Sequence, residues 1–378
     1  MNNKYVIAKF TNSGFGDHLS CVFGAWWYAK STNRTLVIDW RGSRFNPNLG
    51  KNCFFSFFKR VTSLAGVPVI AGDDVADMQF PAPFYPDKWT PNNIKKIKHI
   101  PHTSTEVRDI NTMIEKMIPH DEATIVINQH VHPTPPKAEM HLLLGDMEFS
   151  DAIKDLADRF TNQYLGDAPV IGMHIRHGNG ENIGARASYW LDEVSFIRQL
   201  MLNKQHNIHR RSPDCGPARG AFHDNTAPSL TQQSKTSRAE RNLYKKAASY
   251  VNNLHQEPDF SHASVFLCTD AVRVENGVRE NLDNVFTYPK RMICEGSGPL
   301  HQMKLNHSNS DQEEDTFIPL ETEIVMDMII ELELLRRCKA LVCIPSQFSV
   351  ISRQLLPDNR ICLLKPPLSN RIIARIFK

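Results

Sequence analysis

The stretch VIGMHIRHGNGEN, residues 170–182, decides how the chain folds. Its first six residues are apolar except for His174, which is typical of a strand at the centre of a parallel sheet covered on both faces. The strand runs directly into Arg176 and His177, on a turn that contains two glycines. In open α/β sheets, ligands bind beyond the carboxyl ends of such strands. The stretch therefore predicts an α/β fold with a ligand site at this turn.

The alternation of strand and helix extends in both directions from this stretch. Near the N-terminus, YVIAKF, LSCVFGAWWYAKS and RTLVIDW are predicted to form strand, helix and strand, which implies a parallel pair. ATIVINQHV is a further predicted strand, and later ones are ASVFLCTD, DNVFTYP, KALVCIP and RICLLKPP. The segments ETEIVMDMIIELELLRRC and SQFSVISRQLL are predicted helices, the second opened by Ser346. A helix from Ser150, with Ile153, Leu156, Phe160 and Tyr164 on one apolar face, is expected to connect two halves.

We expect two Rossmann-like halves, with ligands bound in a cleft that faces the carboxyl ends of their strands. The N-terminal half is predicted to span residues 1–165 and the C-terminal half residues 166–365, with residues 366–378 as a tail. The stretch 204–246 is rich in Gly, Pro, Ser, Asn and Arg and has few large apolar residues. We therefore expect it to be a polar insertion in the second half and not a domain.

Composition excludes several classes of protein. The 378 residues carry a formal charge of only +3, so a nucleic-acid-binding function is not expected. The N-terminus lacks the apolar core of a secretory signal, and no window reaches the ~18 apolar residues of a membrane span. The eight cysteines contain no C-x-x-C pair, which favours free thiols in a reducing compartment over a zinc site. We expect a cytoplasmic protein, with the basic and partly apolar tail NRIIARIFK leaving peripheral contact at the inner face of the cell membrane open.

The motif after residue 173 has the chemistry of a phosphate site. Arg176 offers a planar fork of donors, and His177 adds a donor when it is charged. His174 is a candidate for reading a base edge, or else it packs in the core. Gly178 and Gly180 allow close approach of the backbone, and Asn179 tolerates unusual turn dihedrals. The alternative is a turn in which Arg176 pairs with a surface acid.

Four other places are candidates for ligand contact. Gly14 and Gly16 in NSGFGDH form a glycine turn after a strand, but a complete dinucleotide fingerprint would need a third glycine at position 19, where Leu19 stands. Asp270 follows a strand and is either a ligand-facing acid or a helix cap. Ser346 and Gln347 lie at a strand-to-helix turn, where backbone N–H groups bind phosphate. Asp327 interrupts an apolar helical run, so we expect a buried acid that binds either a guanine edge or a neighbouring backbone group.

Glu181 is the carboxylate nearest to the phosphate candidates, which makes it the candidate base. The chain has no G-x-S-x-G elbow and no D-x-D pair for a metal-bridged pyrophosphate. If a sugar diphosphate binds here, cationic side chains are expected to stabilise the leaving group without a metal.

Several of these stretches also carry a family resemblance. GFGD, RTLVIDWRGS, AGVPVI, FPAPFYPDKW, IGMHIRHGNGE, VFLCTD and PKR followed by GPLH resemble the rhizobial nodulation fucosyltransferase (NodZ) family, which is related to the animal core α-1,6-fucosyltransferases. The resemblance implies a GT-B-like fold and a donor-binding second half. It places the donor-binding arginine at Arg176, guanine contacts at His174 and Asp327, diphosphate contacts at Ser346 and Gln347, and the acid of the second motif at Asp270. The insertion is longer than expected for the nodulation enzymes, and IPSQFS resembles the animal members more closely.

The implied activity is inverting, metal-independent transfer of L-fucose from GDP-β-L-fucose to the 6-hydroxyl of a GlcNAc-containing oligosaccharide. The acceptor would be a chitin-oligosaccharide-like molecule or a surface glycan, and no cofactor is implied beyond the donor itself. Two alternatives stay open at this point. One is transfer from another GDP-sugar, and the other is a non-catalytic module that binds GDP or a glycan.

Overall fold

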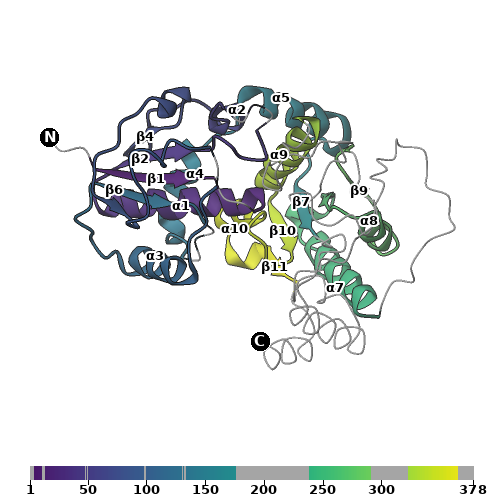
Figure 1. Ribbon diagram of the computed structural model, residues 1–378. Coiled ribbons are helices and arrows are strands. Elements are labelled where there is room, and N and C mark those ends of the chain that lie inside the picture. Colours follow the sequence, from purple (N-terminus) through teal and green to yellow (C-terminus); the bar gives the residue numbers. More distant parts are fainter. Residues whose placement is uncertain are drawn as a thin grey trace, which may run out of the picture. The chain divides into compact units, whose positions relative to one another are not determined.

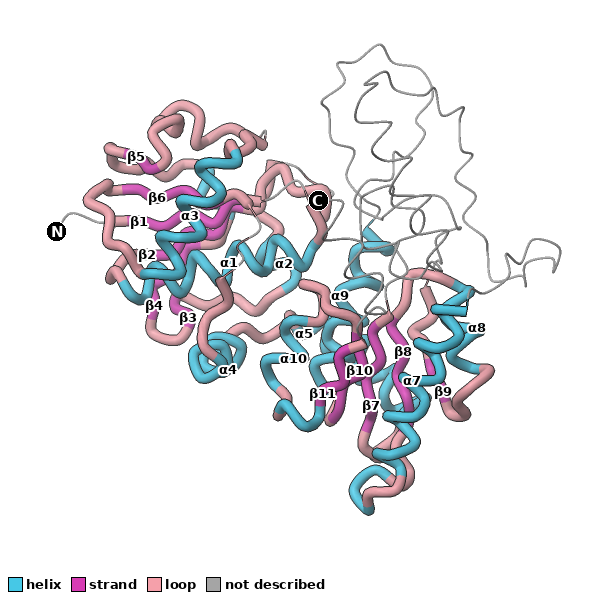
Figure 2. The backbone as a smooth tube through the Cα atoms, turned by 90° about the horizontal axis from the view of Figure 1, so that it is seen from below, coloured by secondary structure: helices cyan, strands magenta, loops and turns pink. Residues whose placement is uncertain are grey.

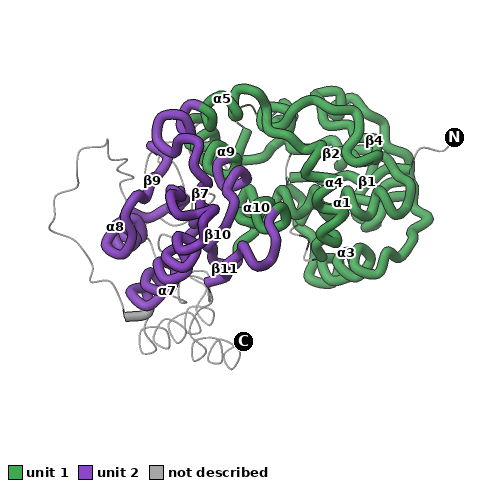
Figure 3. Tube along the Cα trace, turned by 180° about the vertical axis from the view of Figure 1, so that it is seen from behind, with its two compact units in different colours: residues 1–158, 313–333, 346–355 green, residues 159–312, 334–345, 356–378 purple. Residues whose placement is uncertain are grey.

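The structure is a computed structural model, which describes residues 4–10, 13–46, 48, 50–97, 99–129, 131, 133–175, 238–290 and 322–364. The chain divides into two compact units, coloured separately in Figure 3. Unit 1 comprises Met1–Asp158, Glu313–Glu333 and Ser346–Leu355, and unit 2 comprises Arg159–Gln312, Leu334–Pro345 and Leu356–Lys378. Each unit has its own largely parallel sheet (Figure 1).

Within the described residues, the sheet of unit 1 has six strands in the order β3-β4-β2-β1-β6-β5. Neighbouring strands run parallel except β3 and β4, which are antiparallel. The strands are β1 (Tyr5–Lys9), β2 (Thr35–Asp39), β3 (Ser63–Leu64), β4 (Val67–Ile70), β5 (Phe84–Tyr85) and β6 (Thr124–Ile127). β1 pairs with β2 along its whole length, so the predicted N-terminal parallel pair is confirmed.

α1 (Phe15–Ser31) packs on β1 and β2 of this sheet. α3 (Ser104–Lys116) begins with a capping box between Thr103 and Glu106. The other helical elements of unit 1 are α2 (Phe54–Phe57), η1 (Asp73–Ala76), α4 (Lys137–Asp146) and α10 (Val350–Leu355). α10 packs on α4, which explains why this late segment belongs to unit 1.

The helix predicted from Ser150 is α5 (Asp151–Phe160), and it contains the boundary between the two units. Ile153 and Phe160 are buried as expected, but Tyr164 is 43% exposed. The physical reason is the π-helical turn η2 (Thr161–Leu165) that follows α5, in which the Gly166 N–H donates to the carbonyl of Thr161. Tyr164 lies in this wider turn beyond the end of α5, and its ring packs on that of Phe160 with centroids 5.0 Å apart while its outer side stays exposed.

Unit 2 has a parallel sheet of five strands within the described ranges, in the order β11-β10-β7-β8-β9. The strands are β7 (Val170–His174), β8 (Ser264–Cys268), β9 (Val285–Phe286), β10 (Ala340–Cys343) and β11 (Ile361–Leu363). From β7 the chain builds outward through β8 and β9, and it then returns to add β10 and β11 on the other side of β7. Figure 2 shows β10, β7 and β8 side by side. This order confirms the predicted Rossmann-like topology and puts its switch point between β7 and β10.

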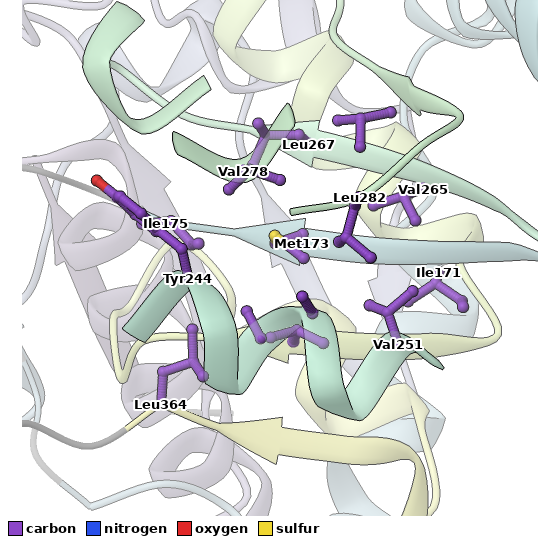
Figure 4. Close-up of a cluster of buried hydrophobic side chains, with 14 of the residues drawn as sticks. Ile171, Met173, Ile175, Tyr244, Val251, Val265, Leu267, Val278, Leu282 and Leu364 are labelled. Atoms are coloured by element: carbon purple, nitrogen blue, oxygen red, sulfur yellow. The ribbon is translucent and has the colours of Figure 1, made fainter. Parts of the chain in front are cut away.

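The core of unit 2 lies between its strands and its helices (Figure 4). Ile171 and Met173 of β7 and Leu267 of β8 pack there with Tyr244 and Val251. The last two belong to α7 (Arg238–His255), the longest helix of this unit within the described residues. The other helical elements of unit 2 are η5 (Pro258–Phe260), α8 (Val272–Arg279) and η7 (Asp358–Arg360), and α9 (Thr322–Arg337) spans the boundary with unit 1 at Glu333.

Residues 238–246, the C-terminal end of the predicted polar insertion at 204–246, form the first half of α7. Leu243, Tyr244, Ala247, Val251 and Leu254 recur at helical spacing and are buried. Charged residues on the other face of the helix obscure this stripe when the segment is judged by composition. Residues 204–237 lie outside the described ranges, as does the tail at 366–378.

No helix in the part of the chain that the structure describes is long and apolar enough to cross a bilayer.

Candidate functional site

The switch point of unit 2 is formed by the ends of β7 and β10. His174 ends β7 and pairs in register with Cys343 of β10 on one side and with Cys268 of β8 on the other. The ladder continues one residue further, because the Ile344 N–H donates to the carbonyl of His174 at 3.2 Å and the Ile175 N–H donates to the carbonyl of Cys268 at 3.1 Å. The point at which the chain leaves the sheet toward the basic turn is therefore fixed.

The basic turn itself begins one residue later. Arg176, His177, Asn179 and Glu181 lie outside the described residues, so their roles stay predictions. His174 is described, and its side chain is 4% exposed within the chain. This burial favours the packing alternative for His174, while its contact with a guanine base stays a prediction.

Asp270 lies at the end of β8, the strand next to β7. The hydroxyl of Thr269 accepts a hydrogen bond from the Ala271 N–H at 3.3 Å and closes the turn into α8. Ala271 is the N-cap residue of α8, with no side-chain cap, so the helix-cap alternative for Asp270 does not hold. Asp270 is half-buried just beyond the carboxyl end of β8, and its contact with a ligand stays a prediction.

The turn after β10 differs from the prediction. The helix expected to open at Ser346 is α10, and it begins only at Val350. Ser346 instead closes a tight turn, because its Oγ accepts from the Ser349 N–H at 3.3 Å, while the Val350 N–H donates to the carbonyl of Gln347 at 3.2 Å. Arg353 Nη2 also donates to the carbonyl of Ser346 at 3.4 Å. The N–H groups of Ser349 and Val350 are therefore used within the turn, and the diphosphate contacts of Ser346 and Gln347 stay a prediction.

Asp327 was expected to be a buried acid, and this expectation is wrong. It is half-buried on α9, in the part of that helix that belongs to unit 1. Ile324 and Val325, and then Ile329 and Ile330, form the buried stripe, so Asp327 falls at the edge of that stripe. Its proposed guanine contact stays a prediction.

The glycine turn before α1 has ordinary backbone dihedrals. Gly14 is extended (φ −68°, ψ 163°), and neither Gly14 nor Gly16 has a positive φ. Gly16 is required for another reason: a Cβ atom built on it would lie 2.6 Å from the carbonyl carbon of Gln347 and 2.6 Å from the nitrogen of Phe348. The glycine therefore permits close approach by the chain's own backbone, within unit 1.

Two residues that sequence reasoning missed hold this glycine turn in place. His18 Nε2 lies 3.0 Å from Ser43 Oγ, and His18 Nδ1 lies 3.3 Å from the carbonyl oxygen of Gly14. Both side chains are buried. The signal was present, because His18 belongs to NSGFGDH and Ser43 ends RTLVIDWRGS, but only the fold shows that these two motifs contact each other.

The motif RTLVIDWRGS is also tied to a buried ion network at the carboxyl ends of β1 and β2. Asp39 Oδ2 lies 2.7 Å from Lys9 Nζ, and Asp39 Oδ1 lies 2.8 Å from Arg41 Nε. Burial raises the pKa of Asp39, but the charges of Lys9 and Arg41 outweigh it and hold the pKa below its usual value. Lys9 also donates to the carbonyl of Ile94 at 3.0 Å. These charges are paired with one another, so this part of the motif stabilises the fold of unit 1.

An open groove of about 880 Å³ lies in unit 1 beside β3 and β4. Its aromatic residue, Phe55, is covered by the guanidinium of Arg60 at 5.1 Å, and its Asp146 accepts from the Ala65 N–H at 2.7 Å. We assign no ligand to it. Within the described ranges, no group of three or more His, Cys, Asp or Glu side chains is placed to hold a metal ion.

Comparisons with known proteins agree with the resemblance seen in the motifs. The family model described as nodulation protein Z (NodZ) matches residues 2–219. Nodulation protein Z of Bradyrhizobium diazoefficiens is 26% identical over 362 residues, which cover 94% of this chain and 80% of that protein. The corresponding protein of Sinorhizobium fredii is 26% identical over 306 residues, with 81% of this chain and 80% of that protein covered.

Solved structures show a related fold. A crystal structure of NodZ α-1,6-fucosyltransferase soaked with GDP-fucose has a TM-score of 0.57 at 21% identity, with 94% of this chain and 93% of that chain covered. A crystal structure of fucosyltransferase NodZ from Bradyrhizobium has a TM-score of 0.55 at 23% identity, with 94% of each chain covered. This likeness confirms the GT-B-like fold class predicted from the sequence.

Proposed function

The chain belongs to the nodulation protein Z family, and on that premise we propose that it is a fucosyltransferase that uses GDP-fucose as its donor. One observation carries the proposal: the strand that leads into HIRHGNGE ends at the switch point of a Rossmann-like sheet. Nucleotide ligands bind at such points. Structures of NodZ fucosyltransferase soaked with GDP-fucose or co-crystallised with GDP support the choice of nucleotide.

The proposed reaction is a single displacement at the anomeric carbon of fucose. The bond between C1 and the β-phosphate oxygen breaks, and its electron pair leaves with GDP. The acceptor's 6-hydroxyl oxygen forms the new bond to C1 from the opposite face, which inverts the configuration. Its proton passes to a carboxylate, for which Glu181 is the candidate.

Fixed cationic donors are proposed to stabilise the charge that develops on the departing diphosphate. Arg176 and His177 are the proposed donors, and the side chains of Ser346 and Gln347 are proposed to add hydrogen bonds from the turn after β10. Preorganised donors of this kind stabilise the transition state more than the bound substrate, so they accelerate the reaction. Asp270, Asn179 and the guanine contacts of His174 and Asp327 complete the proposed donor site. No metal ion is assigned a role.

The acceptor is proposed to be an oligosaccharide that contains GlcNAc. The test is transfer from radiolabelled GDP-fucose to chitin oligosaccharides and, in parallel, to bacterial surface glycans, with and without EDTA. Product linkage and anomeric configuration are then read by NMR. A 1,6-linked α-L-fucoside formed equally well with EDTA present supports the whole proposal.

The outcomes that contradict the proposal are distinct. Turnover of GDP-mannose in preference to GDP-fucose would identify another GDP-sugar transferase. GDP binding measured by calorimetry, with no transfer to any acceptor, would identify a binding module. Loss of activity in EDTA that Mn²⁺ restores would overturn the metal-independent mechanism.

A further inference from the structure

The first turn of α1 and the segment 346–348 are in close backbone contact within unit 1. A Cβ atom on Gly16 would lie 2.6 Å from Gln347 C and Phe348 N and 2.8 Å from Gln347 Cβ. Ordinary van der Waals contact of such an atom begins at 3.4 Å, so adding one methyl group would require a movement of about 0.8 Å or more. Two of the three atoms are backbone, so rotation of a side chain cannot relieve the overlap.

The α1 side of this contact is rigid. Phe15, next to Gly16, packs edge-on against Trp40, Phe45 and Phe57, with ring centroids 5.4–5.6 Å apart. The carbonyl of Gly14 accepts hydrogen bonds from the N–H groups of the first turn, and His18 links that carbonyl to Ser43. An aromatic cluster and a buried hydrogen-bond chain therefore hold the first turn from behind.

The opposite side of the contact has no regular secondary structure. Segment 346–349 is a turn without regular secondary structure, and its internal hydrogen bonds are 3.2–3.4 Å long. It is followed by the six-residue helix α10, which is held on α4 by a 2.5 Å contact between His141 Nε2 and the carbonyl of Gln354. Because α1 is clamped by its core, a side chain at position 16 would displace the turn and not the helix.

We infer that Gly16 is a positioning residue. Because it has no Cβ, the backbone of Gln347 and Phe348 packs directly against it, and this contact fixes the position of the turn that carries Ser346 and Gln347. The inference rests on the proposed function, because it matters for catalysis only if these two side chains contact the donor diphosphate. It differs from a ligand-contact role, since the space beside Gly16 is occupied by the protein's own backbone.

Gly16→Ala tests the inference. A displacement near 1 Å of catalytic contacts can cost about 10²-fold in rate, so kcat/KM for GDP-fucose should fall about 10- to 100-fold. The Kd for GDP should rise about tenfold, while the KM for the acceptor should stay within twofold. Backbone amides in a peptide that covers residues 344–352 should exchange faster with deuterium than in the wild type.

Two glycines of the same unit supply matched controls. Gly24 is also on α1 but lies further along the helix, away from segment 346–349. A Cβ there would meet Val131 Cγ1 at 2.5 Å. Gly24→Ala should lower the unfolding temperature while leaving the GDP Kd and the exchange of 344–352 unchanged. Gly145→Ala on α4 has nothing within 4 Å of the new atom and should change neither quantity.

If Gly16→Ala does not fold, Ser43→Ala is the second variant. It removes the partner of His18 and so loosens the first turn of α1, where Gly16 lies, without adding atoms. It should raise the GDP Kd severalfold and speed exchange in 344–352. Unchanged exchange in this peptide, in whichever of the two variants folds, overturns the inference. If wild-type protein binds no GDP, the proposed function fails. The exchange measurement still decides whether Gly16 fixes the position of the turn at 346–349.

Discussion

The Ile344 N–H donates to the carbonyl oxygen of His174 across 3.2 Å, and this bond joins the ends of the two strands between which the sheet order reverses. Two residues after His174 the chain reaches Arg176, and two residues after Ile344 it reaches Ser346. Both segments proposed to bind the diphosphate therefore leave the sheet from adjacent points. This adjacency follows from topology, because carboxyl ends of neighbouring parallel strands share one edge.

Arg176→Ala should lower kcat by about 10²–10³ if its guanidinium contacts charge that develops on the leaving diphosphate. Both kcat and kcat/KM should fall by similar factors, because the contact strengthens in the transition state. Steady-state kinetics with labelled GDP-fucose measure this. Arg108→Ala is the matched control, since that arginine lies on the surface of α3 with its side chain 72% exposed. Normal turnover combined with weaker donor binding would exclude Arg176 from the chemical step.

Glu181→Gln should slow transfer strongly while leaving GDP affinity within about twofold, because the amide keeps the shape of the side chain but cannot accept a proton. Single-turnover rates and calorimetric titration with GDP separate the two effects. Glu115→Gln, on the exposed face of α3, should change neither. If Glu181→Gln turns over at the wild-type rate, another carboxylate is the base.

Sequence reasoning predicted most of the fold from local patterns and failed where distant contacts decide the outcome. The continuous apolar runs at β6 and β10 are buried along their whole length, as expected for parallel strands covered on both faces. The sequence predicts a glycine turn at Gly16, but the reason that only glycine fits there is contact with Gln347, which is distant in the sequence. Likewise, Asp327 looked buried from its neighbours, yet the rotation of α9 against the core leaves it half-exposed.

The buried ion network should matter more for stability than any exposed pair. Asp39→Asn leaves Lys9 and Arg41 buried without their counter-charge, which should destabilise unit 1 by about 3–5 kcal/mol. Asp109→Asn removes the exposed partner of Arg108 and should cost at most about 1 kcal/mol. Urea unfolding followed by tryptophan fluorescence measures both. Equal midpoints for the two variants would show that the network adds no stability.

The pH dependence of unfolding should reveal a buried histidine in unit 1. The side chain of His102 is fully buried beside Trp89, and its Nδ1 lies 3.6 Å from Glu106 Oε2. Burial, together with the charge of Lys88, lowers the pKa of His102 to about 4, despite the opposing effect of Glu106. In the unfolded chain a histidine titrates near ~6.5. Between these values the unfolded state binds the proton and the folded state does not, so stability falls as the pH falls from about 6.5 to about 4.

The loss attributable to His102 is at most about 3.5 kcal/mol, at about 1.4 kcal/mol for each pH unit between the two pKa values. Glu106 acts in a different window, because its pKa is lowered to about 2, so its contribution is lost only as the pH falls below its unfolded value of 4.5. Burial also lowers the pKa of His99, which therefore adds to the same slope as His102. Unfolding free energies should be measured by urea titration at half-unit steps from pH 7.5 to 4.5. In His102→Phe, which stays neutral at every pH, the slope should be clearly shallower, and a slope equal to that of the wild type would assign the pH dependence to other groups.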